Sequence, residues 1–150
     1  MNKSKLKLKI QVLPNASGIP KQATKEAAGL DLSAGISNSI DLKPNTYKLI
    51  PTGIIAEIPK GFEGQIRPRS GLALKHGLTI LNSPGTIDSD YRGEIGVILQ
   101  NLGSKIFIIE PGMRIAQMVL CPILQPSIQI TNSLSSTERY KDGFGSSGIR

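Results

Sequence analysis

Short apolar runs, separated by turn-forming residues at close intervals, limit what this chain can fold into. Residues 5–12 alternate lysine or glutamine with leucine, isoleucine and valine, which is the period of a half-buried strand. Turn signals such as Pro44-Asn45 and Pro59-Lys60-Gly61 separate the runs that follow. These further strand candidates are residues 27–34, 39–42, 47–52, 54–58, 63–68, 94–99, 105–109, 114–121 and 125–130.

Helical patterning is nearly absent. Only residues 72–75, with Ser70 as the expected N-cap, predict a helix, and it has one or two turns. Many short strands with at most one short helix predict an all-β sandwich or barrel. The 150 residues suffice for a single domain. Because aromatic residues make up only 4% of the chain, we expect an aliphatic core.

The formal net charge of +7 favours an anionic partner. The basic residues are dispersed and aromatic residues for base stacking are scarce, so a small phosphorylated ligand fits better than nucleic acid. The lysines at 5, 7 and 9 are better explained as a solvated strand face. A single histidine, His76, argues against a zinc site. With one cysteine and no apolar run of membrane-spanning length, we expect a cytoplasmic protein without a membrane partner.

Residues 81–99 hold the densest group of candidate site residues. The first half is rich in turn-forming residues, and residues 94–99 read as a buried strand. A turn needs glycine, proline, asparagine and aspartate for its backbone. It does not need an amide, a pair of carboxylates, a phenol and a guanidinium together, as in Asn82, Asp88, Asp90, Tyr91 and Arg92. This combination predicts a ligand site.

Three other segments favour phosphate binding. Arg69, Ser70 and Gly71 place positive charge and free backbone N–H groups at the expected start of the helix. Residues 114–118 put an arginine and Gln117 into an otherwise apolar strand, where water-facing edge positions would be the default explanation. Beyond residue 131 the composition shifts to Ser, Thr, Gly, Lys and Arg, and residues 143–148 could wrap a phosphate with backbone N–H groups.

Taken in order, five segments resemble the trimeric deoxyuridine triphosphatases, or dUTP diphosphatases. They are A-G-L-D-L at 28–32, P-R-S-G-L-A at 68–73, N-S-P-G-T-I-D-S-D-Y-R-G at 82–93, R-I-A-Q-M at 114–118 and R-Y-K-D-G-F-G-S-S-G at 139–148. The resemblance implies a distorted jelly-roll-like β-sandwich or barrel, and a homotrimer with active sites shared between subunits. It also implies hydrolysis of dUTP to dUMP and pyrophosphate with Mg²⁺, which keeps uracil out of DNA and supplies dUMP for thymidylate synthesis.

The resemblance also implies roles for single residues. Asp88 would be the catalytic carboxylate that activates the attacking water, and Tyr91 would lie under the deoxyribose. Asn82 would read the uracil edge with backbone groups of its own segment, which are those of Gly85, Thr86 and Ile87. Asp31 would support the hydration shell of Mg²⁺, and so act through water, or would support an arginine. The implied phosphate contacts are Arg69, Ser70, Gly71 and Gln117.

The C-terminal residues complete the implied site. Residues 1–132 would form the β-rich hydrolase domain, and residues 133–150 a flexible arm that closes over it. In that arm Phe144 would stack on uracil, while Arg139 would bind the γ-phosphate. The remaining arm contacts are Gly145, Ser146 and Ser147. One difference from the family's pattern is Asp142, where a glycine is usual.

Other functions remain open at this point. A dCTP deaminase shares the implied fold, but its chemistry uses a glutamate inside the strand that follows the central turn, and here Glu94 stands only at that strand's start. A non-catalytic nucleotide-binding module could keep the base and phosphate contacts without needing Asp88. Nucleic-acid binding is the remaining alternative, and it predicts affinity that falls steeply with salt.

Overall fold

The protein is built from short antiparallel strands with one short helix in the part described. A computed structural model of the chain describes residues 6–138 and 140–141. The predicted all-β fold with at most one short helix is confirmed for these residues. Its elements are β1 (Lys9–Val12), β2 (Lys21–Gln22), β3 (Leu30–Ser33), β4 (Ile40–Leu42), β5 (Tyr47–Pro51), β6 (Ile54–Glu57), β7 (Phe62–Arg67), α1 (Ser70–His76), β8 (Leu78–Ile80), β9 (Gly85–Ile87), β10 (Gly96–Asn101), β11 (Phe107–Ile109) and β12 (Arg114–Pro122).

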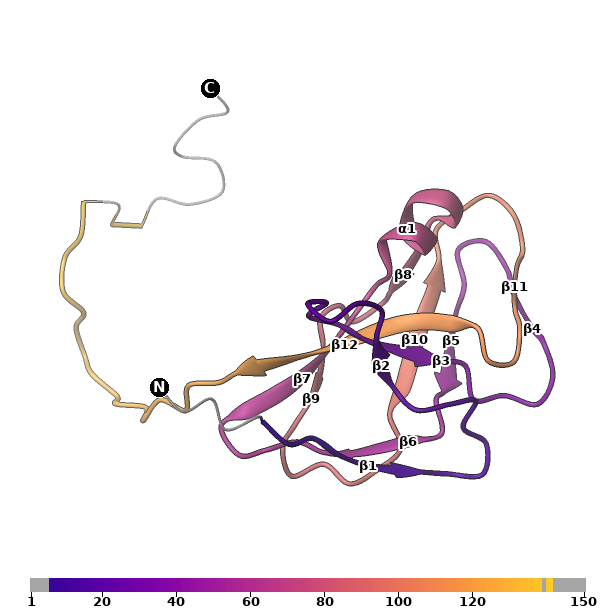
Figure 1. Cartoon of the computed structure of the whole chain (residues 1–150). Helices are drawn as coiled ribbons and strands as arrows, with labels where there is room; N and C mark the ends of the chain where they lie inside the picture. Colours follow the sequence, from indigo (N-terminus) through magenta and orange to yellow (C-terminus); the bar gives the residue numbers. More distant parts are fainter. Residues whose placement is uncertain (1–5, 139, 142–150) are drawn as a thin grey trace.

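Two sheets form most of the molecule. The larger has the strand order β2-β3-β12-β7-β9, and the smaller the order β5-β10-β8. Two further pairs, β1 with β6 and β11 with β4, complete the strands described. Figure 1 shows β12 passing through the middle of the body, with α1 at one end beside β8. Since β12 is flanked by β3 and β7, it is an interior strand.

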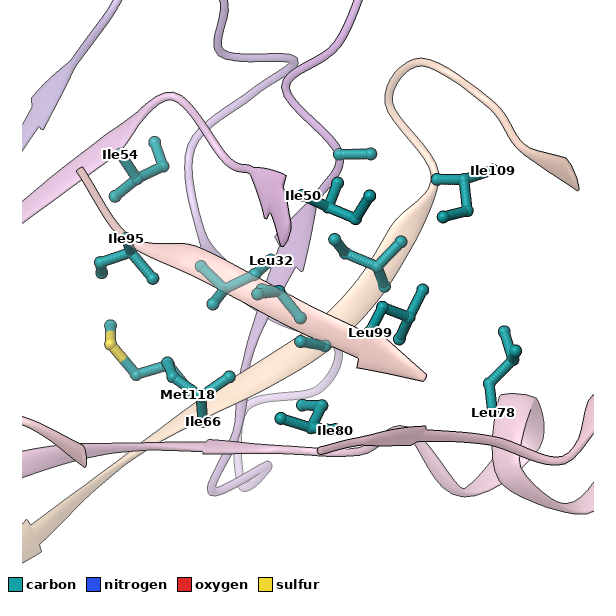
Figure 2. Packing of buried hydrophobic residues seen from close by; sticks show 14 of the residues in the cluster. Leu32, Ile50, Ile54, Ile66, Leu78, Ile80, Ile95, Leu99, Ile109 and Met118 are labelled. Carbon is teal, nitrogen blue, oxygen red and sulfur yellow. The ribbon is translucent and has the colours of Figure 1, made fainter. Parts of the chain in front are cut away.

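The core lies between the two main sheets and is aliphatic, as predicted. Figure 2 shows Leu32, Ile66 and Met118 of the larger sheet facing Ile50 and Leu99 of the smaller one. Alternate residues of β10 point inward, as the period of a strand requires. This packing fixes the two sheets against each other.

One polar side chain is fully buried at the end of β10. Asn101 has no exposed surface. Its Nδ2 donates hydrogen bonds to the carbonyl oxygens of Leu42, at 2.9 Å, and Lys105, at 2.8 Å. Its Oδ1 accepts a 2.8 Å hydrogen bond from the Gly103 N–H. Asn101 therefore joins the end of β4 to the connection between β10 and β11, and its hydrogen bonds offset the cost of burying the amide.

The central stretch differs from the prediction of a turn followed by a strand over residues 94–99. The strand begins and ends two residues later, as β10, and residues 85–87 of the supposed turn form an additional strand, β9. These two strands belong to different sheets, because β9 pairs with β7 whereas β10 pairs with β5 and β8. The stretch therefore crosses from one sheet to the other.

Two further predictions are wrong. Residues 125–130 form no strand, and Leu124, Ile128 and Ile130 are more than 90% exposed, because no strand among the described residues pairs with them. In Figure 1 this segment, drawn in orange and yellow, leads away from the body. The N-terminal strand is also shorter than residues 5–12, since β1 covers only Lys9–Val12 within the described chain.

The helix begins one residue earlier than the N-cap prediction allows. Arg69, with φ −92° and ψ 126°, occupies the N-cap position without a side-chain cap, and Ser70 is the first helical residue. The prediction of Ser70 as N-cap is therefore wrong. Gly77, in the left-handed region at φ 69°, ends the helix by donating its N–H to the Ala73 carbonyl. No helix in the described residues is long and apolar enough to cross a membrane.

Candidate active site

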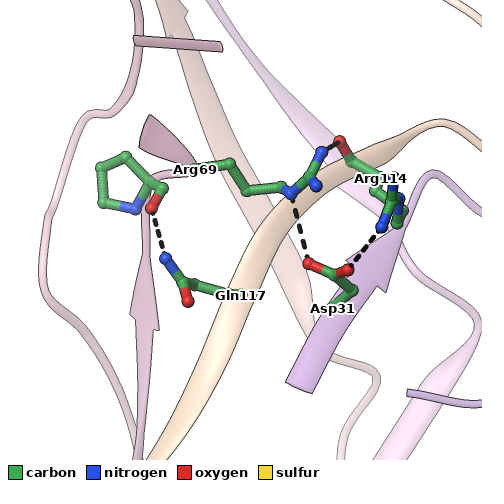
Figure 3. Close-up of polar contacts among 5 residues, drawn as sticks. Asp31, Arg69, Arg114 and Gln117 are labelled. Carbon is green, nitrogen blue, oxygen red and sulfur yellow. Dashed lines mark hydrogen bonds and ion pairs between the residues drawn. The ribbon is translucent and has the colours of Figure 1, made fainter. Parts of the chain in front are cut away.

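An aspartate held by two arginines forms the centre of one candidate site. Asp31 lies on β3 directly opposite Gln117 of β12, which brings the first and fourth predicted segments together. Its Oδ1 is 3.2 Å from Nε of Arg69, and its Oδ2 is 2.9 Å from Nη1 of Arg114. Figure 3 shows the carboxylate between the two guanidinium groups. The prediction that Asp31 could support an arginine therefore agrees with the geometry.

Both arginines retain donors for a further anion. Arg69 Nη1 also donates a hydrogen bond to the Arg114 carbonyl oxygen at 3.2 Å (Figure 3). These contacts use two of the five N–H donors of Arg69. One carboxylate against two guanidinium groups leaves a net positive charge, so the cluster favours an anionic ligand. The sequence left a water-facing position on an edge strand as the default for Arg114: β12 is an interior strand, but the Arg114 side chain at its start is 55% exposed.

The Gln117 side chain is fixed from two sides. Its Nε2 donates a 2.9 Å hydrogen bond to the Pro68 carbonyl oxygen, as Figure 3 shows. Its amide also lies over Gly29, where a Cβ would collide with Oε1. The amide is therefore held in place with one N–H directed to the backbone and the other available to a ligand.

A cavity of about 410 Å³ collects the predicted phosphate residues. It also includes two ionisable side chains to which the sequence analysis gave no role in a site, Lys75 and His76. Helical spacing could have identified Lys75, because it lies one turn after Gly71 on the same face of α1. The full lining is Ala23, Asp31, Arg69, Ser70, Gly71, Leu72, Lys75, His76 and Gln117.

A second cavity, of about 330 Å³, collects the side chains of the central stretch. Asp88 and Tyr91 are close because the Tyr91 N–H donates to the Asp88 carbonyl oxygen at 3.2 Å, closing one turn. Gly85 lies buried beneath the Asn82 side chain, whose Nδ2 would be 3.1 Å from a Cβ there. The lining is Leu49, Asn82, Thr86, Ile87, Asp88, Tyr91, Glu94, Gly96 and Ile98.

Glu94 lines this second cavity and is committed to the backbone around it. Its Oε1 accepts hydrogen bonds from the Gly53 N–H, at 2.7 Å, and from Nδ2 of Asn15, at 2.9 Å. Its carbonyl oxygen accepts a 3.0 Å hydrogen bond from the Tyr91 hydroxyl. From the sequence, Glu94 was weighed only as a possible deaminase glutamate. Its hydrogen bonds with Gly53 and Asn15 could not be predicted, because both residues are far away in sequence.

The two cavities share no lining residue. Ile87 lies opposite Gly64, and Gly64 lies opposite Leu120, which is three residues beyond Gln117. Two strand spacings and three residue rises separate Ile87 from Gln117 by about 14 Å. A third cavity, of about 590 Å³, brings Ser83 and Pro84 beside Ser70 and Gln117. Within one chain, the predicted base and phosphate residues thus form two separate groups.

The remaining predicted residues belong to the C-terminal arm. Arg139, Phe144, Gly145, Ser146 and Ser147 lie outside the described residues.

The chemistry of the donors is compatible with an indirect magnesium contact. The described residues contain no group of three or more His, Cys, Asp or Glu side chains that could hold a metal ion by themselves. Among the residues that the structure describes, Asp31 alone contributes a carboxylate to the lining of the cavity of about 410 Å³. Since each carboxylate oxygen has a lone pair beyond the one facing an arginine, it can also accept a hydrogen bond from a metal-bound water. Mg²⁺ commonly keeps several waters and binds to substrate phosphates, which fits this donor set.

Comparison with known proteins gives consistent results. The family model described as dUTPase matches residues 15–148. The chain is 58% identical over 137 residues to the deoxyuridine 5'-triphosphate nucleotidohydrolase of Chlamydia pneumoniae, covering 91% of this chain and 94% of that protein.

Solved structures agree with these relatives. The fold matches that of the Staphylococcus bacteriophage 80alpha dUTPase with dUPNHPP, at a TM-score of 0.86 and 29% identity, over 95% of this chain and 99% of the other. A mutant dUTPase from phage phi11 of S. aureus, described as showing the coordination of a structural Mg(II) ion, matches at a TM-score of 0.77 and 25% identity, over 85% and 97% of the two chains.

Proposed function

The chain belongs to the dUTPase family and is a dUTP diphosphatase, and we propose that a water molecule activated by Asp88 attacks the α-phosphate. The observation that carries this proposal is the cavity in which Asp88 lies with Asn82 and Tyr91. The amide of Asn82 would contact the base, the carboxylate of Asp88 would contact the water, and the phenol of Tyr91 would contact the sugar. The products of this attack are dUMP and pyrophosphate.

Asp88 would act as the general base. Water is a poor nucleophile, and a positioned carboxylate that takes its proton in the transition state accelerates attack by roughly 10² to 10⁴-fold. Asp88 is exposed at the cavity, so a water can reach it. The turn closed by the Tyr91 N–H fixes its backbone. A binding module would have no need of this carboxylate, which is why an enzymatic role is favoured.

Uracil would be read by Asn82 and the backbone of β9. An amide side chain offers both donors and an acceptor, which suits the mixed donor and acceptor edge of uracil. β9 is an edge strand, and it pairs with β7 on one side only, so its other backbone groups can serve a ligand. Gly85 allows Asn82 to lie close to this strand. Cytosine presents the opposite groups at the same edge and would leave buried polar groups unpaired.

The sugar would lie on the Tyr91 ring. Tyr91 is 44% exposed, so one face of the ring is accessible from the cavity. A flat ring placed close to the sugar leaves no space for a ribose 2'-hydroxyl. Packing discriminates between deoxyribose and ribose less sharply than hydrogen bonding would. The selectivity therefore depends on the position of the ring.

The phosphates would be bound by the Arg69 side chain with Ser70, Gly71 and Gln117. Arg69 and Gln117 line a cavity whose lining is net positive, and their remaining donors would form charge-assisted hydrogen bonds with a triphosphate there. When bound, Mg²⁺ would neutralise charge on the phosphate oxygens. Asp31 would contact one of its waters while it continues to hold Arg69 and Arg114.

We propose that the complete site forms between copies of the chain in a homotrimer. The base and phosphate groups of one chain form separate cavities, so a neighbouring copy can supply the missing half. The segment after β12 exposes Leu124, Ile128, Ile130 and Leu134 by 88% to 95%, an apolar surface that another subunit would cover. Residues 133–150 would then close over a neighbour's site, with Arg139 on the γ-phosphate and Phe144 on the base.

The test combines a substrate panel with one substitution. Pyrophosphate release is measured with dUTP, UTP, dCTP and dTTP, and we expect dUTP to be strongly preferred. We expect Asp88→Asn to bind dUTP with affinity within about threefold of the parent but to lose roughly two to three orders of magnitude in kcat. Asp90→Asn is the matched control, since Asp90 is a carboxylate of the same turn that does not line the cavity. Near-normal turnover by Asp88→Asn would refute the proposed role of Asp88.

A further inference from the structure

The orientation of the Tyr91 ring is set by its own segment. A Cβ on Gly93 would collide with the hydroxyl end of the ring, so the side chain folds back over this glycine. At the end of this fold the hydroxyl donates its 3.0 Å hydrogen bond to the Glu94 carbonyl oxygen. The phenol is therefore held at its far end, even though the ring is 44% exposed. A ring held at both ends cannot swing away from a ligand without breaking this contact.

The carbonyl that holds the phenol is itself fixed through the Glu94 side chain. Oε1 accepts the 2.7 Å hydrogen bond from the Gly53 N–H and the 2.9 Å hydrogen bond from Asn15. Gly53 has φ 72°, and a Cβ there would collide with the backbone of Ala16. This close packing fixes the backbone conformation of Gly53, and with it the direction of the N–H that binds Glu94. The carboxylate thus joins the Tyr91 segment to two other parts of the chain.

These contacts continue into the core. Thr52 Oγ1 donates a 2.6 Å hydrogen bond to the Ile95 carbonyl oxygen, and the Ile95 N–H donates a 2.8 Å hydrogen bond to Ile54. Thr52 and Ile95 are at most 1% exposed. The residues on both sides of the Gly53–Glu94 hydrogen bond therefore belong to a rigid part of the molecule.

We propose that Glu94 is a positioning residue that sets the selectivity for deoxyribose over ribose. Its carboxylate fixes the carbonyl that holds the Tyr91 hydroxyl, and so fixes the distance between the ring and the 2' position of the sugar. This inference rests on the role of Tyr91 proposed above. Exclusion of one hydroxyl by packing is sensitive to small displacements, because a ring that retreats by an ångström leaves room for it.

The experiment measures kcat and KM for dUTP and UTP in the full-length enzyme. We expect Glu94→Ala to lower the ratio of kcat/KM for dUTP over UTP by about tenfold, with the change carried mainly by KM. Glu94→Gln keeps an oxygen at the Oε1 position, so we expect it to restore the ratio to within about twofold of the parent. A merely structural role would lower activity on both substrates together and leave the ratio unchanged.

Tyr91→Ala separates failure of this inference from failure of the site. If Tyr91→Ala loses discrimination while Glu94→Ala keeps it, Glu94 does not position the ring, and the role of Tyr91 stands. If Tyr91→Ala keeps discrimination, the proposed sugar contact is wrong, and the role of Glu94 falls with it.

Asn15→Ala carries the test should Glu94→Ala fail to fold. It removes one of the two hydrogen bonds to the carboxylate and leaves the Gly53 contact. We expect it to lower the ratio by a smaller factor in the same direction. A ratio unchanged in a folded Asn15→Ala enzyme would contradict the proposal.

Discussion

At the scale of the residue, the sequence predicted the chemical character of single site residues but not the residues with which they form hydrogen bonds and ion pairs. Asp31 between two leucines on a short strand predicts an acid on the face opposite the apolar side chains. That its partner is Arg114, 83 residues away, depends on the β3–β12 register, which shifts between Arg114 and Ala116. Likewise, Glu94 could be located but not its contacts with Gly53 and Asn15. Such pairs arise from tertiary packing, which local sequence patterns do not contain.

Removal of the Asn101 side chain tests how much one buried amide contributes to stability. Asn101→Ala would leave the Leu42 carbonyl oxygen in the buried part of this network, and the partly buried Lys105 carbonyl oxygen and Gly103 N–H, without this partner. We expect a loss of about 3 kcal/mol in the free energy of unfolding, since each unpaired buried group costs roughly 1–3 kcal/mol. Denaturant titration measures it, with exposed Asn38→Ala as the control. A loss below 0.5 kcal/mol, roughly the size of a surface effect, would contradict this role.

The Lys9–Glu57 ion pair predicts a small dependence of stability on acid. The hydrogen bond from Lys9, at 2.7 Å, and its positive charge lower the pKa of Glu57. A carboxyl group whose pKa is lower in the folded state than in the unfolded state stabilises the folded protein at pH values above the unfolded-state pKa. This stabilisation is lost as the pH falls through the folded-state pKa. We expect Lys9→Met to raise the pKa of Glu57 in an NMR titration, with little change in stability because both side chains are exposed. An unchanged pKa would contradict the assignment.

At the scale of the element, the alternation of apolar and polar residues predicted most strands. Whether the other segments form strands depends on pairing with a neighbouring strand. The strands β5, β6, β7, β11 and β12 fall within a residue or two of the predicted ranges. β9 was missed because three residues after a proline show no periodicity, and they become a strand only by pairing with β7. Residues 125–130 have strand-like composition, but no described strand of the chain pairs with them. Strand propensity reflects how well side chains pack against neighbouring strands, so it does not by itself produce a strand where no neighbouring strand is present.

Truncation tests the proposed C-terminal arm. We expect deletion of residues 135–150 to leave a particle of three times the mass of the truncated chain but to lower kcat at least a hundredfold. The reason is that the γ-phosphate and base contacts proposed for Arg139 and Phe144 would be removed, while residues 124–134 would remain. Sedimentation and pyrophosphate release measure the two quantities. A truncated enzyme with normal kcat, or a full-length monomer, would contradict the arm or the trimer.

At the scale of the whole molecule, the aliphatic core between the two sheets places the two cavities apart in one chain. The central stretch crosses from β9 of the larger sheet to β10 of the smaller one, and Asp88 and Tyr91 lie at that crossing, whereas Asn82 lies in the preceding connection from β8 to β9. The phosphate residues lie instead around β3, β12 and the start of α1. Residues predicted for the base and for the phosphates each line a cavity of their own, but sequence order alone could not show that the two groups are separate.

The central claim is that water attacks the α-phosphate of dUTP in the cavity containing Asp88. Hydrolysis in ¹⁸O-labelled water, followed by mass spectrometry of both products, tests it most directly. The account predicts that a single turnover places one ¹⁸O atom in the phosphate of dUMP and none in pyrophosphate, because the bond broken lies between the α-phosphorus and its bridging oxygen. Label found in pyrophosphate instead of dUMP would place the attack on the β-phosphorus and contradict the account.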